Sequence, residues 1–380
     1  MGAIANLIAH QLFLSTEDKD RLLSACLLHH HPEEILGSNR TEVADGVRAI
    51  LAASLGQDMG KTEDRTLASI LRLANAVDET IQSQQFPRVD VTEITSGLRQ
   101  GVGKGWWPRR VLEAFQECTR PVTMPPPLEW RVPVFPQAAV RTLEAMRNPS
   151  VSVPQVVDAA RRDPATAGCI MHLANSALYS ERGEVATLQM AVARVGFEIA
   201  CKVVATLAMR PLLFLPHLED LWPHSIEVAD LSEQLARRSV GVDPAEAYLA
   251  GLLHDVGRIA LRATTLYNAA RLEGLVESGC SPVYAEDLIL PMNHAGLGAQ
   301  IARMWKLPER LVAAIQHHHR PEAASGPLPG LVYLAEQLAG SDEDLPSEAR
   351  LHLALAQTGL TERDMQGCER SGVGNWLAAA

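Results

Sequence analysis

Aromatic residues are scarce in this chain, at 4% of 380 residues, although hydrophobic residues make up 47%. The cores must therefore be filled by Ala, Leu, Val and Ile, which favours helices packed closely through small side chains. Charged residues make up 21%, a share typical of folded globular proteins rather than disordered ones. A chain of this length has room for two or three domains.

Several localisation signals are missing from the sequence. No apolar run reaches the roughly 18 residues of a membrane span, because the best candidate, 203–221, is interrupted by Arg210, Pro211 and Pro216. The start MGAIANLIAHQL has neither the basic region nor the cleavage site of a signal peptide. The six cysteines are scattered, without a CxxC pair, as is typical of a reduced protein. We therefore expect a cytoplasmic protein.

An excess of positive charge is also lacking. The formal net charge is −11, which argues against a protein that works by coating nucleic acid or an anionic membrane. We expect neither nucleic acid nor membrane among its partners.

The apolar spacing is helical almost throughout, and no convincing period-2 run occurs. This predicts an all-α fold, a multi-helix bundle. Residues 1–86 are predicted to form an extra helical region. Residues 87–130 hold three closely spaced glycines and a triple proline, which predict a linker. The main domain is predicted over 131–340, with a five-helix part over 131–215 that begins with a helix over 135–149, and a part over 216–340. A helical tail is predicted over 341–380, and we expect it to serve only as a packing arm.

Potential metal ligands lie along the part over 216–340. They are His224, His254, Asp255, His294, a His317–His319 run and Glu336. Imidazoles and carboxylates suit Fe, Mn, Ni or Zn, and helix bundles build such sites from inward-facing side chains on neighbouring helices. A metal held there would lower the pKa of a bound water, making it a nucleophile toward a phosphoester.

Each of these histidines taken alone is most often a core residue with one hydrogen bond. The His254–Asp255 pair is harder to explain in that way, because burying a carboxylate costs several kcal/mol unless it is paired or ligated. Arg258, one turn further on, is the partner that needs no metal. A metal site and a His–Asp–Arg network both remain open from the residues alone.

The order of these residues resembles the HD superfamily of metal-dependent phosphohydrolases. The stretches DPATAGCIMHLANSALY, AGLLHDVGR and HAGLGAQIARMWKLPERLVAAIQHHHRPE resemble, more narrowly, the HDOD output domain of bacterial signalling proteins. This resemblance covers about 133–340 and implies an HD-like helical core over 216–340. Carried over by position, it makes metal ligands, or their vestiges, of His224, His254, Asp255, His294, His318 and Glu336.

Two departures bear on activity. The superfamily has Asp at the last acidic position, where this chain has Glu336, whose extra methylene moves the carboxylate by about 1 Å. Relatives that hydrolyse cyclic di-GMP carry a Gly-Tyr-Pro triplet after the double His, whereas the text here is HHRPEAASGPLP. The resemblance therefore implies a regulatory module, non-catalytic, with a metal- or nucleotide-binding pocket. The alternative is a metal-dependent phosphohydrolase acting on a nucleotide or cyclic dinucleotide, with Arg258 steadying the transition state.

A weak internal repeat concerns the N-terminal region. ACLLHHHPEE over 25–34 echoes AAIQHHHRPE over 313–322, and ILRLANAVDE over 70–79 echoes LVYLAEQLAG over 331–340. Residues 1–86 thus resemble the end of a second, degenerate HD-like domain, with Asp78 as its remaining acidic position and no metal expected.

Signalling within the main domain is expected to pass between its two parts or to a partner. Asn175, Ser176 and Tyr179 are predicted to line the seam between these parts, although Asn175 and Ser176 are more often plain turn residues. The expected partner is a signalling protein or a small nucleotide, and the fold allows a homodimer.

Overall fold

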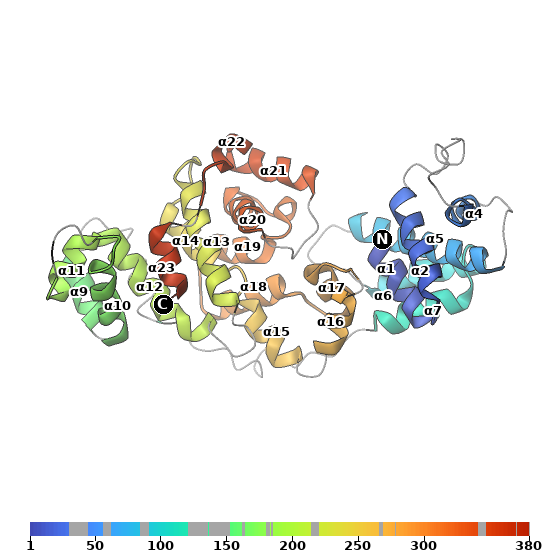
Figure 1. The fold of residues 1–380 in the computed structure, drawn as a ribbon, viewed down its shortest axis with the longest axis horizontal. Coiled ribbons are helices and arrows are strands. Elements are labelled where there is room, and N and C mark those ends of the chain that lie inside the picture. The colour runs from blue at the N-terminus through green and yellow to red at the C-terminus, as the bar shows by residue number, and fades with distance from the viewer. Residues whose placement is uncertain are drawn as a thin grey trace. The chain divides into compact units, whose positions relative to one another are not determined.

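The structure is a computed structural model of the chain. It describes residues 1–29, 45–55, 62–83, 91–120, 136, 153–161, 164–179, 183, 185–213, 220–265, 269–277, 279–340, 347–369 and 371–379. Every regular element among them is a helix, which confirms the all-α prediction (Figure 1). Of the helix expected over 135–149, only Pro136 lies among these residues. No described helix is long and apolar enough to cross a membrane.

The chain divides into two compact units. The first joins Met1–Pro125 with Thr265–Met292, and the second joins Pro126–Thr264 with Asn293–Ala380. The helices of the first unit are α1 (Gly2–Gln11), α2 (Thr16–Leu28), α4 (Asp45–Ser54), α5 (Thr62–Ser83), α6 (Val91–Gly103), α7 (Arg109–Cys118), α16 (Ala269–Glu277) and α17 (Pro282–Ile289).

Two helices of the first unit lie inside the segment predicted to be a linker. The fold of α6 and α7 depends on Gly101, because a Cβ there would lie 2.1 Å from the Trp107 ring. That ring is buried, and its Nε1 donates to the Leu98 carbonyl at 3.2 Å. Gly101 therefore serves helix packing, although its sequence context suggests a loop.

The N-terminal histidine repeat is described only in part. His29 ends α2, and its Nε2 lies 3.0 Å from Oδ1 of Asn75. Asp78 accepts from the N-terminal ammonium of Met1 at 3.1 Å. The following residues, 30–44, lie outside the described part of the chain.

The second unit holds the tail and both parts of the predicted main domain except residues 265–292, which belong to the first unit. Its helices are α9 (Val153–Arg161), α10 (Pro164–Ala174), α11 (Leu188–Val195), α12 (Phe197–Leu213), α13 (Leu221–Ala236), α14 (Pro244–Leu253), α15 (Gly257–Thr265), α18 (His294–Met304), α19 (Glu309–His317), α20 (Pro327–Ala339), α21 (Glu348–Thr358), α22 (Glu362–Met365) and α23 (Gly372–Ala379), with a 3-10 turn at Pro321–Ala323.

Small residues set the closest helix contacts of the second unit. At Gly251 of α14 a Cβ would lie 2.7 Å from Cα of Ala229, so α14 packs directly against the backbone of α13. At Gly257 a Cβ would lie 1.8 Å from the carbonyl oxygen of His294 and 2.5 Å from the amide nitrogen of Gly298. The start of α15 therefore touches the start of α18, and both contacts adjoin the His254–Asp255 pair.

Candidate metal centre

Four helices and the turn after α14 supply the polar side chains of one buried region. His224 lies in the first turn of α13, and Glu336 lies near the end of α20. His254 ends α14, so it and Asp255 occupy the turn before α15. This short break in the helical backbone lets two adjacent residues face different neighbours.

Helix starts and ends place the remaining candidate ligands, His294, His318 and His319. The Asn293 side chain accepts from the Gly296 amide at 3.0 Å, which starts α18 at His294. The helix α19 ends at His317, with His318 as its C-terminal cap and His319 directly after it. Ends of helices are therefore brought to one point.

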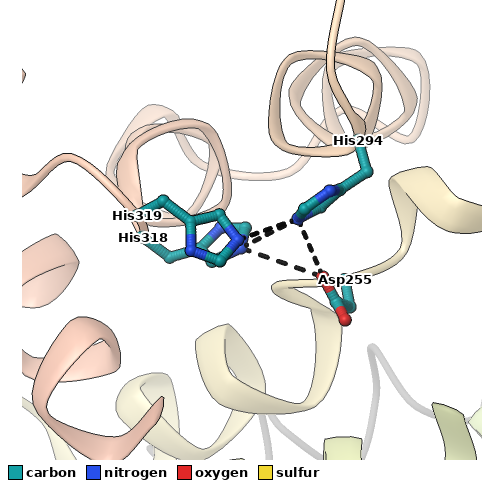
Figure 2. A group of neighbouring side chains, drawn as sticks. All are labelled: Asp255, His294, His318 and His319. Carbon is teal, nitrogen blue, oxygen red and sulfur yellow. Dashed lines mark hydrogen bonds and ion pairs between the residues drawn. The ribbon is translucent and has the colours of Figure 1, made fainter. Parts of the chain in front are cut away.

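The first cluster consists of Asp255, His294, His318 and His319, all of them buried (Figure 2). The Nε2 atom of His294 lies 3.1 Å from Oδ1 of Asp255. The same atom lies 3.3 Å from Nε2 of His318 and 3.0 Å from Nε2 of His319. His318 Nε2 is 3.8 Å from Asp255 Oδ1.

The second cluster consists of His224, His254 and Glu336. Oε1 of Glu336 lies 2.6 Å from Nε2 of His254 and 3.1 Å from Nε2 of His224. The clusters meet where Nε2 of His254 approaches Oδ2 of Asp255 at 3.5 Å. Glu336 thus reaches both histidines of its cluster despite being one methylene longer than the acid expected there.

Two imidazoles are oriented by the backbone. Nδ1 of His254 lies 2.6 Å from the Gly251 carbonyl oxygen, and Nδ1 of His318 lies 2.7 Å from that of Ile315. Because a carbonyl oxygen only accepts, each Nδ1 carries the hydrogen and donates it. The Nε2 atom of each ring therefore points into the clusters, as in histidines that bind metals.

The charges of the two carboxylates are held by their neighbours. Burial alone would raise the pKa of Asp255, but the positive charges of Arg258 and His254 outweigh it and hold that pKa well below its usual range. Burial also acts on Glu336, where His254 and His224 in turn keep the pKa well below normal. Arg258 donates from Nε to Oδ2 of Asp255 at 2.6 Å. Both acids are thus ionised inside the protein.

The histidines divide between two protonation states. Burial opposes the charge of His254, but the carboxylates of Asp255 and Glu336 raise its pKa well above the ordinary value. Burial and the charges of nearby histidines lower the pKa of His318 to about 3, and they hold that of His319 well below normal. Without a cation, a proton on His254 therefore offsets the two carboxylates, and a cation bound at Nε2 would replace that proton. His318 and His319 are neutral, the form that binds metals.

The donor atoms fit a divalent cation. With metal–ligand bonds of about 2.1 Å, neighbouring donors around one ion are about 3 Å apart, close to the separations of 3.0, 3.1 and 3.3 Å around His294. Nε2 of His254, Oδ1 of Asp255 and Oε2 of Glu336 are buried and make no hydrogen bond of good geometry within the described residues. Unsatisfied buried polar atoms are costly, and a cation would satisfy them.

Similarity to known proteins decides the family. A model of the HDOD domain matches residues 132–321, which is half of the chain. The chain belongs to the HDOD domain family. The resemblance seen in the sequence is thereby confirmed.

Two solved structures and one curated relative are also similar to the chain. A protein from Marinobacter aquaeolei, provisionally assigned to signal transduction, is 21% identical with a TM-score of 0.55, covering 80% of this chain and 68% of its own. A provisionally assigned phosphohydrolase from Shewanella amazonensis is 25% identical with a TM-score of 0.50, covering 66% of this chain and 95% of its own. Ribonuclease Y from Geobacter sulfurreducens is 27% identical over 198 residues, 52% of this chain and 31% of that protein. The chain spans about a third of the length of the first curated relatives that it matches.

All six residues assigned by sequence lie in the two clusters, and five of them lie within the HDOD match while Glu336 follows it. The clusters also contain His319, which the sequence pattern does not single out. Three consecutive histidines give no signal of their own, because only the end of α19 decides which of them turn inward. His317 stays within the helix and is only half-buried.

The residues predicted for the seam of the HDOD domain have local partners. Asn175 Nδ2 donates to the Val185 carbonyl at 3.0 Å, and its Oδ1 accepts from the Val185 amide at 2.8 Å. Ser176 Oγ donates to the Leu173 carbonyl at 2.7 Å. Burial raises the pKa of Tyr179. These bonds hold the turn after α10, and a role at the seam stays a prediction.

Proposed function

We propose that this chain is a regulatory signalling module whose HDOD domain binds a divalent cation, without turnover, in the pocket formed by the two clusters. The observation that carries the proposal is the convergence of imidazoles and two carboxylates in two clusters, in each of which the donor atoms lie within 4.8 Å of one another. Such a set is expensive to bury without a cation. The pocket would then act as a sensing or organising centre.

Each cluster would supply the ligands of one bound group. Asp255, His294, His318 and His319 would hold one cation, and His224, His254 and Glu336 would hold a second or a ligand that carries one. A bound cation in such a site can polarise a phosphate oxygen or lower the pKa of a water. Within the site, backbone carbonyls orient two of the imidazoles, and the two carboxylates carry negative charge. Burial keeps the donor atoms away from water.

Burial supports the regulatory assignment over catalysis. Asp255 and His318 are 1% and 0% exposed, whereas the His224 side chain reaches 22%. A substrate would have to reach the donors past His224 or Arg258. The Marinobacter neighbour is provisionally assigned to signal transduction, and Gly-Tyr-Pro is missing after the histidine run.

The second candidate is a metal-dependent phosphohydrolase of nucleotides or cyclic dinucleotides. It is favoured by the complete set of ligand positions and by Glu336, which reaches both histidines of its cluster. Arg258 adjoins Asp255 and is 17% exposed, so it could contact a phosphate. The Shewanella neighbour is provisionally assigned as a phosphohydrolase.

The expected partner of the regulatory module is a signalling protein or a small nucleotide.

Metal content and turnover separate the two candidates. Untagged protein is assayed for Fe, Mn, Ni and Zn, and then incubated with a generic phosphodiester and with cyclic dinucleotides. The regulatory proposal expects near-stoichiometric metal, no turnover and loss of metal in Asp255→Ala. The control is Asp158→Ala, whose side chain is 66% exposed on α9.

Two results would count against the proposal. Turnover that Asp255→Ala abolishes and Asp158→Ala preserves would establish the phosphohydrolase instead. If the protein takes up none of the four metals, the clusters form a metal-free His–Asp–Arg network and the proposed cation site is wrong.

A further inference from the structure

A buried ion network joins α12 to α13 and α14. Nζ of Lys202, on α12, lies 2.6 Å from Oδ1 of Asp230 and 2.7 Å from Oε2 of Glu233, both on α13. The same ammonium lies 4.4 Å from the ring centre of Tyr248 on α14. The Tyr248 hydroxyl is hydrogen-bonded to Oγ1 of Thr206 at 2.7 Å. These five residues, the Lys202 network, make the joint between the five-helix part and the HD-like part polar.

The end of the chain completes this network. The Ser371 amide donates to Oδ2 of Asp230 at 2.5 Å, and the Ser371 hydroxyl donates to Oδ1 at 3.0 Å. Further along α13, Gln234 donates to the Glu369 carbonyl at 2.7 Å. Helix α23 then packs on α13 with Leu377 fully buried. The clasp, residues 361–369 and 371–379, is thus bound along one side of α13.

Asp230 needs this partner. It is 2% exposed, Lys202 donates only to Oδ1 of its carboxylate, and the donor to Oδ2 from α13 itself, Gln234, lies at a long 3.4 Å. Leaving a buried charged group short of hydrogen bonds costs more than the bond itself contributes. The network is therefore complete only while the clasp is docked.

The same helix carries a residue of the candidate metal centre. His224 precedes Asp230 by six residues, about 9 Å along α13. Helix α13 also packs against α20, which supplies Glu336. Because packed protein interiors have low compressibility and transmit strain, a shift of α13 would change the distance between His224 and Glu336 as well as the surface on which Ser371 docks.

We propose that docking of the clasp on α13 is energetically coupled to cation binding in the pocket, so that the C-terminus regulates, or reports, occupancy of the site. The inference rests on the proposed function for its cation. Coupling of this kind is reciprocal: a cation strengthens docking by the factor by which docking strengthens cation binding. The clasp would then be the element that a partner protein reads or displaces.

Hydrogen exchange and Mn²⁺ affinity test the coupling on the full chain. In the wild-type protein, saturating Mn²⁺ should slow amide exchange in residues 372–379. Ser371→Ala removes a hydrogen bond to a charged group, so exchange there should rise roughly tenfold and Mn²⁺ affinity should fall several-fold. Exchange in α12 should rise as well, even without metal.

Ser347→Ala is the matched control. Ser347 caps α21, accepting from the Arg350 amide at 3.3 Å, on a helix that packs against α20. This variant also removes one serine hydroxyl and its hydrogen bond, but it leaves every bond between the clasp and α13 in place. It should keep wild-type exchange in α23 and wild-type affinity for Mn²⁺.

Failure of the clasp and failure of the cation site give different results. If amide exchange in α12 and α23 is unchanged in metal-free Ser371→Ala, Ser371 does not hold the clasp on α13, and the proposal fails whatever the metal data show. Wild-type Mn²⁺ affinity in Ser371→Ala, despite faster exchange in α23, overturns the coupling and leaves the cation site intact. A wild-type protein that binds no metal overturns the proposed function and the coupling together.

Discussion

His317 and His319 are two residues apart and lie in different surroundings. His319 is buried with Nε2 3.0 Å from that of His294, while His317 is half-buried on α19. We expect His319→Ala to lower Mn²⁺ affinity by roughly tenfold or more, because it removes a donor of the first cluster. His317→Ala should leave the affinity unchanged. Isothermal titration calorimetry with Mn²⁺ measures the affinity of both variants. If the two variants bind Mn²⁺ equally well, His319 is not a ligand of the cation.

Three thiols are protected by burial. Burial raises the pKa of Cys26, Cys201 and Cys280 to about 12 in each case. The thiolate is the reactive form, so iodoacetamide at pH 8 should leave these three unmodified in the folded protein. The half-exposed Cys118 and Cys169 should react first, and peptide mass spectrometry after timed quenching gives the order.

The same shift has a consequence for alkaline stability. A folded-state pKa above the unfolded value near 9 means that the folded protein holds these protons more tightly. The resulting stabilisation is complete below pH 9 and is lost as the pH rises toward 12. Urea unfolding at a series of alkaline pH values should show a falling free energy of unfolding. Early alkylation of Cys201 at pH 8 would contradict its assigned burial.

At the scale of elements, the contact between α15 and α18 tolerates no side chain. In Gly257→Ala the new Cβ would meet the His294 carbonyl oxygen at 1.8 Å and the Gly298 amide at 2.5 Å, both backbone atoms. Overpacking of this kind costs about 1–3 kcal/mol. Thermal and urea unfolding should show that loss.

Gly168→Ala offers the comparison within the same unit. Gly168 lies on α10, and no atom outside its own helix backbone lies within 4 Å of the place that an alanine Cβ would take. Alanine there should therefore gain up to about 1 kcal/mol of helix stability. If Gly257→Ala were as stable as Gly168→Ala, the close approach of α15 and α18 would be refuted.

Elements follow from the sequence where a local signal exists. Thr187 accepts from the Met190 amide at 3.2 Å and starts α11 where the spacing predicts a helix. The linker predicted over 87–130 is wrong for α6 and α7, because closely spaced glycines resemble a loop. Gly101 is instead used for packing against Trp107, and a single sequence does not distinguish the two uses.

At the scale of the whole molecule, metal binding should appear in thermal stability. A ligand that binds only the folded state at 100 times its Kd adds about 2.7 kcal/mol. We expect Mn²⁺ to raise Tm, a chelator to reverse the rise, and Asp255→Ala to abolish it. A Tm of the wild type that does not depend on metal would count against the cation site.

The residues of the candidate site can be predicted from the sequence, but the long-range contacts around it cannot. The six candidate ligand positions follow from the resemblance to the HD superfamily, carried over position by position along the chain. The joint made by Lys202, Asp230 and Ser371 depends on residues up to 169 positions apart, which no local pattern connects. The compartment and the partners stay predictions.

Because His254 and Asp255 are consecutive, the two clusters share a single peptide unit. Any pair of ions bound there would face each other across that unit with only two carboxylates to offset four positive charges. Uptake of divalent ions should thus be anticooperative, with one strong and one weak stoichiometric step. The weaker position would then be the one open to an anionic messenger that enters together with its own counter-ion.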